Sequence, residues 1–389
     1  MIDMTKTIAV IFGGRSAEHD VSIITAHTPI IQSLLAVGEF DVWPVYISKD
    51  GLWYSDKAMN DILYFKNDNF EANPAKHKKI QLLFDQGLKI IWPGIRSKTV
   101  KIDVVFPAMH GTFGEDGSLM GLLRMAGVPF VGCDLFASAV AMDKVLTKQV
   151  LAVEGIPVVP YVWFTKFDWK ENKNAWKEKI SKLKWPVFVK PVHLGSSIAI
   201  TKVKEEKDLE NAIEVAFHYD DKVLVEEGVA NLIEVTLPII GNEKLQLAAI
   251  ERPLNKTEFF DFEDKYLSGG KKGSGVNSQY SEIPANISSE LKERVEDLGR
   301  QTYKILGCSG IARVDFLIEG SLNQVYVNEV NTLPGSLYCH NWRKVGVSDA
   351  ELVTKLVSLA EERFNSRKNT TYTFKSDILK KTGGRKMAE

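Results

Sequence analysis

The sequence has few cysteines, no excess charge of either sign and no long apolar run. Its three cysteines, Cys133, Cys308 and Cys339, are scattered through 389 residues and form no CxxC pair. An odd, sparse set argues against a disulfide framework or a cysteine-based zinc site and is typical of a reducing compartment. The 49 basic and 50 acidic residues balance, so we expect no nucleic-acid partner.

The N-terminal apolar run is short. TIAVIF, at Thr7–Phe12, is about as long as one strand and has no small-residue cleavage site after it, so we interpret it as a buried strand. We expect no segment to approach the length of a membrane span, and we therefore expect a cytoplasmic protein without a membrane partner. The chain is long enough for two or three domains.

The first part of the chain alternates strands and helices. Apolar runs at 7–12, 41–47 and 104–109 alternate with helical stretches, which predicts an open parallel α/β layer. Gly13 and Gly14 form a tight turn after the first strand, but GxGxxG is absent, which disfavours a dinucleotide-dependent dehydrogenase. The later loop HGTFGEDG lies at the carboxyl end of a strand, where such sheets bind ligands. Taken alone, that loop is better explained as an ordinary Gly-rich turn that caps the next helix through Asp116.

Two adjacent strands carry the clearest chemical pattern. IARVDFLI and QVYVNEV are separated by a Gly/Ser/Asn turn, which predicts a hairpin. Alternate residues share a face, so Arg313 and Asp315 point the same way, as do Glu329 and Asn331. Three oxygen-bearing side chains beside one Arg suit Mg²⁺, although a lone carboxylate pair would more often be a solvated strand face. The Pro-Gly turn that follows offers amides to an oxyanion.

The middle of the chain is suited to polyphosphate. WPVFVKP places Lys190 at the end of a buried strand, and HLGSSIAI supplies backbone and hydroxyl donors. A later strand ends in a carboxylate, Glu226, where an adenine or ribose can lie. The long loop at 258–288 predicts a lid that closes on nucleotide. Periodicity predicts helices over 137–155, 166–184, 205–217, 288–306 and 349–364.

These motifs resemble those of the D-alanine–D-alanine ligase family of ATP-grasp carboxylate–amine ligases. They are FGGRSAEHDVS, HGTFGEDGSLMGLL, AMDK, VKPVHLGSS, DFEDKYLS and RVDFLI followed by NEVNTLPG, in the family's order over residues 7–364. The resemblance implies an α/β and α+β protein with the ATP-grasp fold and an N-terminal open parallel α/β domain. It implies domains at 1–136, 137–230 and 231–365, with a polar tail at 366–389.

The resemblance also implies an activity and site residues. The activity is ATP- and Mg²⁺-dependent ligation of two D-alanines through a D-alanyl phosphate, for peptidoglycan precursors, by a homodimer. ATP is bound by Lys144, Lys190, Glu226, Glu234 and Lys265. Two Mg²⁺ ions, replaceable by Mn²⁺, are held by Asp315, Glu329 and Asn331. Glu18 binds the first D-alanine and forms a trio with Ser196 and Tyr266. Arg313 and the Gly335 amide stabilise the oxyanion, and the second-substrate side includes His110, Glu115, His340 and Asn341.

The chain departs from the family's pattern on the acceptor side. His340 stands where a Ser is usual, Met120 replaces a Gln and Ala199 replaces a Gly, and the lid is longer. The acceptor therefore stays open between D-alanine and another compound, such as D-serine, D-lactate or another amine. The Tyr266 match accompanies D-alanine rather than D-lactate in the family. A nucleotide-binding regulator without turnover is the alternative from another class, and the complete Lys and Mg²⁺ set disfavours it.

Overall fold

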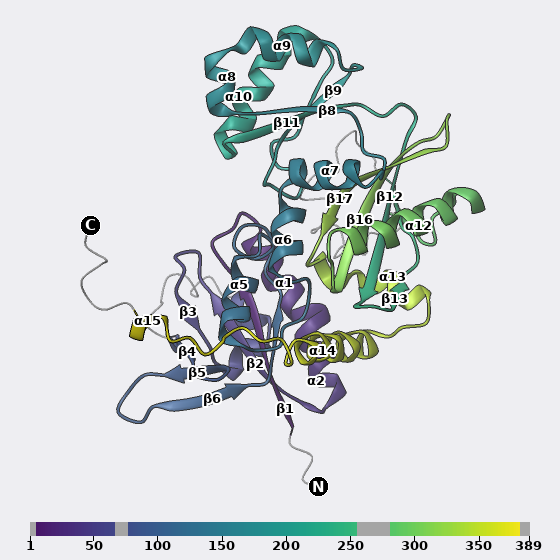
Figure 1. The fold of residues 1–389 in the computed structure, drawn as a ribbon. Coiled ribbons are helices and arrows are strands. Elements are labelled where there is room, and N and C mark those ends of the chain that lie inside the picture. The colour runs from purple at the N-terminus through teal and green to yellow at the C-terminus, as the bar shows by residue number, and fades with distance from the viewer. Residues whose placement is uncertain (1–4, 67–76, 255–280, 382–389) are drawn as a thin grey trace.

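The fold is described from a computed structural model that covers residues 5–66, 77–254 and 281–381. Three α/β units surround two short helices, α6 (Leu135–Met142) and α7 (Lys144–Val153), which lie in the middle of the view (Figure 1). The N-terminal unit lies below them, a small central unit above them and the C-terminal unit beside them. Each unit has its own sheet, so the site residues come from three separate sheets.

The N-terminal unit contains the expected parallel strands and one sheet that the sequence did not predict. The first sheet has the order β3-β2-β1-β7, with β1 (Lys6–Gly13), β2 (Phe40–Ile47), β3 (Trp53–Tyr54) and β7 (Val104–Pro107). β1 is parallel to both β2 and β7. The second sheet is antiparallel and consists of β4 (Gln81–Phe84), β5 (Leu88–Trp92) and β6 (Lys98–Ile102). The predicted parallel layer is therefore present, and the antiparallel sheet is an addition that the sequence did not indicate, because β4 and β6 are short and largely exposed.

One helical stretch of this unit corrects the expectation about membrane segments. It consists of α1 (His19–Thr25), a π-helical segment η1 (Ala26–Ile31) that includes Pro29, and α2 (Gln32–Val37). By length and composition, His19–Val37 is apolar enough to cross a membrane, so the expectation that no segment approaches this length is wrong. Of that stretch, 56% is buried inside the protein, where α1 packs on β1 and α2 packs on α14 (Asp349–Ser366). The unit also contains η2 (Lys57–Asn60), α3 (Leu63–Lys66) and α5 (Ser118–Ala126).

The central unit is an antiparallel sheet covered on one face by helices (Figure 1). Its strands, in the order β10-β9-β11-β8, are β8 (Tyr161–Thr165), β9 (Val187–Pro191), β10 (Thr201–Val203) and β11 (Lys222–Glu227). Its helices are α8 (Lys166–Glu171), α9 (Lys173–Ser181), η4 (Glu206–Asp208) and α10 (Leu209–Tyr219).

Two helices that periodicity predicts as continuous are broken by capping residues. Asn172 separates α8 from α9, with its side chain accepting a hydrogen bond from the Ala175 amide. Asp143 separates α6 from α7, has an extended backbone (φ −86°, ψ 101°) and accepts hydrogen bonds from the amides of Val145 and Leu146. Short polar side chains compete for backbone donors and favour helix N-termini over helix interiors. The second break places Lys144 on the first turn of α7.

The C-terminal unit contains the predicted hairpin. Its sheet, in the order β13-β12-β16-β17, consists of β12 (Leu232–Gly241), β13 (Leu245–Leu247), β16 (Gly310–Glu319) and β17 (Gln324–Asn331), all antiparallel. α12 (Ser289–Ile305) packs on this sheet. A short ribbon joins β14 (Arg252–Pro253) to β15 (Ser281–Glu282), and most of the loop expected to form a lid lies outside the described residues. The chain continues through η6 (Gly335–Tyr338), α13 (Cys339–Lys344) and α14 to α15 (Ile378–Lys381).

Arg363 ties the N-terminal and C-terminal units together. Its buried guanidinium, on α14, donates to the Ser309 hydroxyl (2.6 Å) and to the carbonyl of Phe130 (2.6 Å). It also donates to the carbonyl of Gly132. A buried cation that satisfies acceptors from two segments costs a great deal to displace. The start of β16 is thereby fixed against the N-terminal unit.

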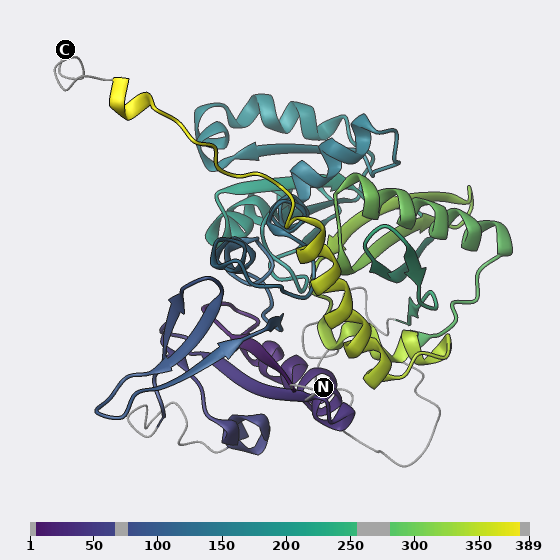
Figure 2. The same ribbon diagram turned by 60° about the horizontal axis from the view of Figure 1, so that its bottom comes forward.

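The cysteines nearby, Cys133 and Cys308, are free and buried, as is Cys339. After α14 the chain runs away from the three units (Figure 2).

Candidate active site

Four polar side chains meet on one face of β16 and β17. Arg313 lies opposite Asn331 in the register, and Asp315 lies opposite Glu329. The Arg313 guanidinium donates to both Asp315 oxygens, from Nε at 2.6 Å and from Nη2 at 2.5 Å, and lies 4.0 Å from Glu329 Oε1. Asn331 Nδ2 donates to Asp315 Oδ2 at 3.2 Å. Burial alone would lower the pKa of Arg313, but the Asp315 carboxylate outweighs it and keeps the guanidinium charged.

The turn after β17 bends the chain back over this cluster. Ser336, Leu337 and Tyr338 have left-handed backbones, with φ of 50°, 51° and 52°. Each non-glycine residue in this region costs roughly 1 kcal/mol or more and is found where surrounding contacts enforce it. One such contact is a hydrogen bond from Arg313 Nη1 to the Tyr338 hydroxyl at 2.9 Å, with the Tyr338 ring 4.8 Å from the guanidinium carbon. Tyr338 is a site residue that the sequence did not indicate, since nothing in SLYCHNW signals a left-handed run.

Glu18 marks a polar cavity between the N-terminal and central units. Its carboxylate accepts a hydrogen bond from the Ser196 hydroxyl, so two residues far apart in the sequence are joined directly. The cavity has a volume of about 340 Å³, and Glu18, Gly111 and Gly195 all line it. A Cβ at Gly111 would lie 2.8 Å from Glu18 Oε2, so only glycine leaves room for the carboxylate. Tyr266, predicted as the third member of this trio, lies outside the described residues.

Two groups on this side of the site, the half-buried Glu115 and the buried His110, are neutral at neutral pH. Burial, followed by the charge of Glu18, raises the pKa of Glu115 to about 8, even though the Gly111 amide donates to it at 2.7 Å. Burial, followed by the charge of Arg313, lowers the pKa of His110 to about 4. His110 Nε2 lies 2.9 Å from the Thr25 hydroxyl, which also accepts a hydrogen bond from the Ser336 amide at 3.3 Å. This side of the site therefore offers neutral hydrogen-bonding groups.

Lysines from α7 and β9 approach from the opposite side. Lys144 Nζ donates to the carbonyl of Leu194 at 2.6 Å, in the small-residue loop after β9. Burial lowers the pKa of Lys144, and the charge of Glu329 opposes this shift, which places the lysine within the electrostatic reach of the β17 cluster. Lys190 and Lys148 both pair with Glu226, which is buried. Burial would raise the pKa of Glu226, but the two lysines lower it to about 2.

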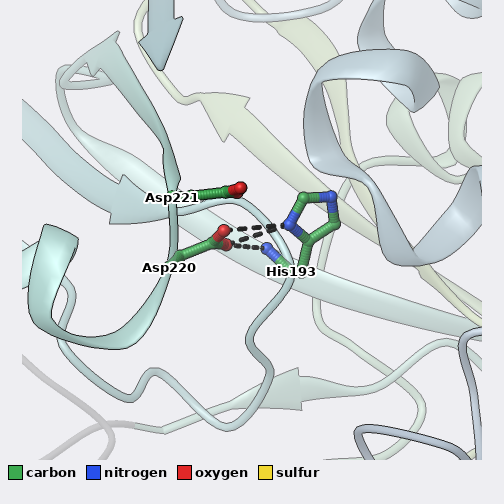
Figure 3. Close-up of side chains that lie close together, drawn as sticks. All are labelled: His193, Asp220 and Asp221. Carbon is green, nitrogen blue, oxygen red and sulfur yellow. Dashed lines mark hydrogen bonds and ion pairs between the residues drawn. The ribbon is translucent and has the colours of Figure 1, made fainter. Parts of the chain in front are cut away.

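His193 fixes the loop after β9 through contacts with two aspartates. His193 Nδ1 lies 3.0 Å from Asp220 Oδ1, and its Nε2 lies 3.3 Å from Asp143 Oδ2, which also accepts from Lys222 at 2.7 Å. Asp143 first and Asp220 second raise the pKa of His193 to about 9, so the ring is an imidazolium at neutral pH. Figure 3 shows Asp221 beside Asp220, and the three oxygen and nitrogen ligand atoms are close enough for a metal ion. Both ring nitrogens of the imidazolium are protonated and face carboxylates, so the ring has no lone pair for a metal ion, and we interpret the cluster as a set of ion pairs. His193 was missed as a site residue, although it lies within the VKPVHLGSS motif.

The residues expected in the acceptor pocket lie on and beside α13. His340 Nε2 is 2.9 Å from Glu251 Oε2, and the His340 ring lies 5.2 Å from the ring of Tyr338. Asn341 is fully buried and donates to the carbonyl of Ala249 at 2.8 Å, which makes it part of the wall. His340 thus connects through Tyr338 to Arg313, and Glu251 is a partner that the sequence did not indicate.

Three predicted site residues remain, Glu234, Lys265 and Gly335. Glu234 lies on β12 opposite Leu317, and among the residues that the structure describes no polar contact joins it to Glu226. Lys265, predicted to reach a phosphate, lies outside the described residues. Gly335 begins η6, directly before the left-handed run.

The β16–β17 cluster fits a hard divalent cation. Two carboxylates and one amide oxygen are the ligands that Mg²⁺ prefers, and a single guanidinium on the same face offsets only one carboxylate. Around this cluster the molecule places lysines on one side and neutral hydrogen-bonding groups on the other. Such a site is suited to transfer a phosphoryl group to a carboxylate held near Glu18, because its fixed charges match a polyphosphate and the charge that develops on it.

We predict that Glu115 makes the protein less stable as the pH rises. Because its pKa is raised in the folded state, the folded protein binds one more proton than the unfolded chain between the two pKa values. Relative to Glu115→Gln, the free energy of unfolding of the wild type should fall by up to ~1.4 kcal/mol per pH unit between about pH 5 and 8. Urea unfolding across this range measures the slope. Glu154→Gln, at an exposed position, is the control, and an equal slope for wild type and Glu115→Gln would show that Glu115 ionises normally.

Comparison with known proteins identifies the family. A domain model described as D-ala D-ala ligase N-terminus matches residues 7–133, and one described as D-ala D-ala ligase C-terminus matches residues 150–358. The chain is 37% identical over 362 residues to a D-alanine--D-alanine ligase of Thermosipho melanesiensis, covering 93% of this chain and 95% of that one. It is 37% identical over 380 residues to a D-alanine--D-alanine ligase of Acetivibrio thermocellus, covering 92% and 97%.

Solved structures agree with the sequence relatives. The VanG D-Ala:D-Ser ligase from Enterococcus faecalis superposes with a TM-score of 0.76 at 34% identity, covering 92% of this chain and 100% of that one. The D-alanine-D-alanine ligase from Coxiella burnetii superposes with a TM-score of 0.76 at 30% identity, covering 93% and 96%. The three units are therefore those of the ATP-grasp architecture, and the chain belongs to the D-alanine–D-alanine ligase family.

Proposed function

We propose that this protein joins two D-alanine molecules into D-alanyl-D-alanine for peptidoglycan precursors, and converts one ATP to ADP and phosphate in each cycle. The observation that carries this proposal is the register of β16 and β17, which places Arg313, Asp315, Glu329 and Asn331 on one face. Lys144 on α7 lies within electrostatic reach of Glu329, and Lys190 lies on β9 of the central unit. The Glu18–Ser196 pair joins the N-terminal and central units. Regulators that only bind nucleotide have no need for a buried carboxylate site of this kind next to the phosphate site.

The reaction divides into two steps. In the first, a carboxylate oxygen of D-alanine attacks the γ-phosphorus of ATP, the bond to the β-phosphate oxygen breaks, and ADP leaves. In the second, the amine of the acceptor attacks the acyl carbon of D-alanyl phosphate, and phosphate leaves with the former carboxylate oxygen. Glu18 binds the ammonium of the first D-alanine, and the lysines neutralise the phosphates. Carboxylate, amine and phosphate supply all the reacting atoms, so no side-chain nucleophile is required.

Asp315, Glu329 and Asn331 would hold two Mg²⁺ ions, with Mn²⁺ as a substitute. Bound there, the ions supply positive charge to the β- and γ-phosphates. Arg313 lies beside these ligands, and with the Gly335 amide it would stabilise the oxyanion of the tetrahedral intermediate. The contact from Arg313 to Tyr338 supports this role, because it fixes the guanidinium against the turn that carries Gly335.

The proposal also includes the protein's location, its oligomeric state, its domain bounds and three residue assignments. We place the reaction in the cytoplasm and expect a homodimer. We keep the division of the chain at 1–136, 137–230, 231–365 and 366–389. Lys265 and Tyr266 are assigned to the lid by family resemblance, and Glu234 to the adenosine by the same resemblance.

The proposal is tested by supplying Mg²⁺-ATP and D-alanine alone. We expect ADP, phosphate and a product with the mass of D-alanyl-D-alanine in equal amounts. Release of AMP and pyrophosphate would contradict the proposed chemistry. ADP without dipeptide would show that the acceptor is a different compound.

The metal-site assignment predicts the effect of Glu329→Gln. Replacing this carboxylate removes one ligand charge without changing the side-chain shape, so kcat/KM should fall ~100-fold or more and the Mg²⁺ requirement should rise. Circular dichroism and thermal melting should be unchanged. Glu319→Gln, at the other end of the same hairpin, is the matched control and should retain normal activity. Near-normal activity of Glu329→Gln would remove this residue from the metal site.

One observation favours a second candidate function, ligation of D-alanine to another acceptor such as D-serine, D-lactate or another amine. His340 stands where the family carries Ser, and its ring nitrogen pairs with Glu251 within 2.9 Å. A ring hydrogen-bonded to a carboxylate here changes the size and polarity of the acceptor wall. The VanG neighbour, named a D-Ala:D-Ser ligase, belongs to the same fold.

We predict that His340→Ser shifts acceptor preference. The KM for at least one acceptor in a panel of D-alanine, D-serine and D-lactate should change ~10-fold, because a polar contact at the acceptor is gained or lost. Glu251→Gln should shift the same acceptor, since it breaks the pair from the other side. The KM for ATP should stay within ~2-fold of wild type. His218→Ser, on the exposed face of α10, is the control, and a changed KM for ATP in His340→Ser would contradict the acceptor-side placement.

A further inference from the structure

Lys148 is a buried lysine that the proposed reaction does not use. It lies on α7, one turn after Lys144, and its side chain is 2% exposed. Its Nζ is 3.0 Å from Glu226 Oε2 and 5.6 Å from the centre of the Tyr161 ring. Neither Lys148 Nζ nor Glu226 Oε2 has a hydrogen-bond partner with good geometry among the described residues. The pair is therefore held by charge, in a setting where a lone ammonium or carboxylate would be very unfavourable.

Glu226 has two cations that differ in exposure. Lys190 pairs with Oε1, and its side chain is 11% exposed, so it has access to the site. Lys148 pairs with Oε2, and its side chain is buried away from the site. An ammonium shared between Glu226 and a phosphate stabilises each anion less than one that faces it alone, so phosphate binding draws the charge of Lys190 away from Glu226. A buried carboxylate that loses its only counter-ion is strongly destabilised, so this exchange requires a second cation.

We propose that Lys148 is a positioning residue: the resident counter-ion of Glu226, which lets Lys190 exchange that carboxylate for a nucleotide phosphate. The inference rests on the proposed function, in which Lys190 binds ATP. Lys148 never touches the nucleotide. It keeps Glu226 ionised and in place throughout the cycle, so that the cost of moving Lys190 is small.

Removing the charge of Lys148 should affect phosphate binding and spare adenosine binding. In Lys148→Met, Glu226 has only Lys190 as a counter-ion, and Lys190 stays with it. ATP then loses one charge-assisted contact, which corresponds to a ~10- to 100-fold weaker Kd. Adenosine has no phosphate and loses nothing. A general distortion of the pocket would weaken both ligands.

The test is titration calorimetry of ATP and of adenosine with the full-length protein. For Lys148→Met we expect the ATP Kd to rise ~10-fold or more and the adenosine Kd to stay within ~2-fold. At saturating ATP, kcat should stay within ~3-fold, and Lys148→Arg should restore most of the ATP affinity. Lys182→Met is the matched control: its Nζ is also 3.0 Å from a glutamate, Glu178, but both side chains are exposed. An unchanged ATP Kd, or an equal loss for ATP and adenosine, would overturn the proposal.

A second comparison holds even if Lys148→Met does not fold. Glu226→Gln removes the carboxylate that needs a counter-ion, so adding Lys148→Met in that background should leave the ATP Kd within ~2-fold. A further loss in the double variant would show that Lys148 acts on the nucleotide directly and would overturn the proposal. Wild-type protein that binds no ATP would instead refute the proposed function.

Discussion

The site depends on the excess of negative charge on one face of the β16–β17 hairpin, where Asp315 and Glu329 lie beside the single cation Arg313. Two carboxylates on one sheet face cannot be desolvated next to a single guanidinium without a further source of positive charge. The Arg313–Asp315 pair satisfies one of them, and the register brings Glu329 next to it. Near this face lie one cation, Lys144 from α7, and two groups that are neutral at neutral pH, the protonated Glu115 and the unprotonated His110. The chain is organised to receive cations and a polyanion together.

The framework that holds these groups contains local strain. Residues 336–338 and the loop residues Ser196, Ser197 and Ala199 all have left-handed backbones. Both segments are fixed by hydrogen bonds to distant elements. Residues 336–338 bond to Arg313 and Thr25. In the second segment, Ser196 bonds to Glu18 and the Leu194 carbonyl accepts from Lys144. Strain of this kind is found where surrounding contacts over-determine the backbone, as they do at preorganised sites. Arg363 hydrogen-bonds to both the N-terminal and the C-terminal unit and so fixes the position of one side of the site relative to the other.

The sequence predicted what depends on local periodicity and failed where a single residue breaks it. Strict alternation gave the hairpin and its polar face, and the motif order connected Glu18 with Ser196. The helix over 137–155 was wrong because Asp143 caps α7, and the same residue anchors His193. Lys148 was missed because a lysine one turn after another on a helix usually indicates a solvated face. Tyr338 and Glu251 were missed because their contacts arise from a left-handed turn and from a sheet edge, which have no one-dimensional signal.

The fate of one carboxylate oxygen tests the account most directly. If D-alanine is activated as an acyl phosphate, one oxygen of its carboxyl group must leave with the phosphate. With D-alanine labelled by ¹⁸O at both carboxyl oxygens, mass spectrometry should find one ¹⁸O atom in each molecule of phosphate released, and ADP as the nucleotide product. Unlabelled phosphate, or label in AMP, would contradict the account.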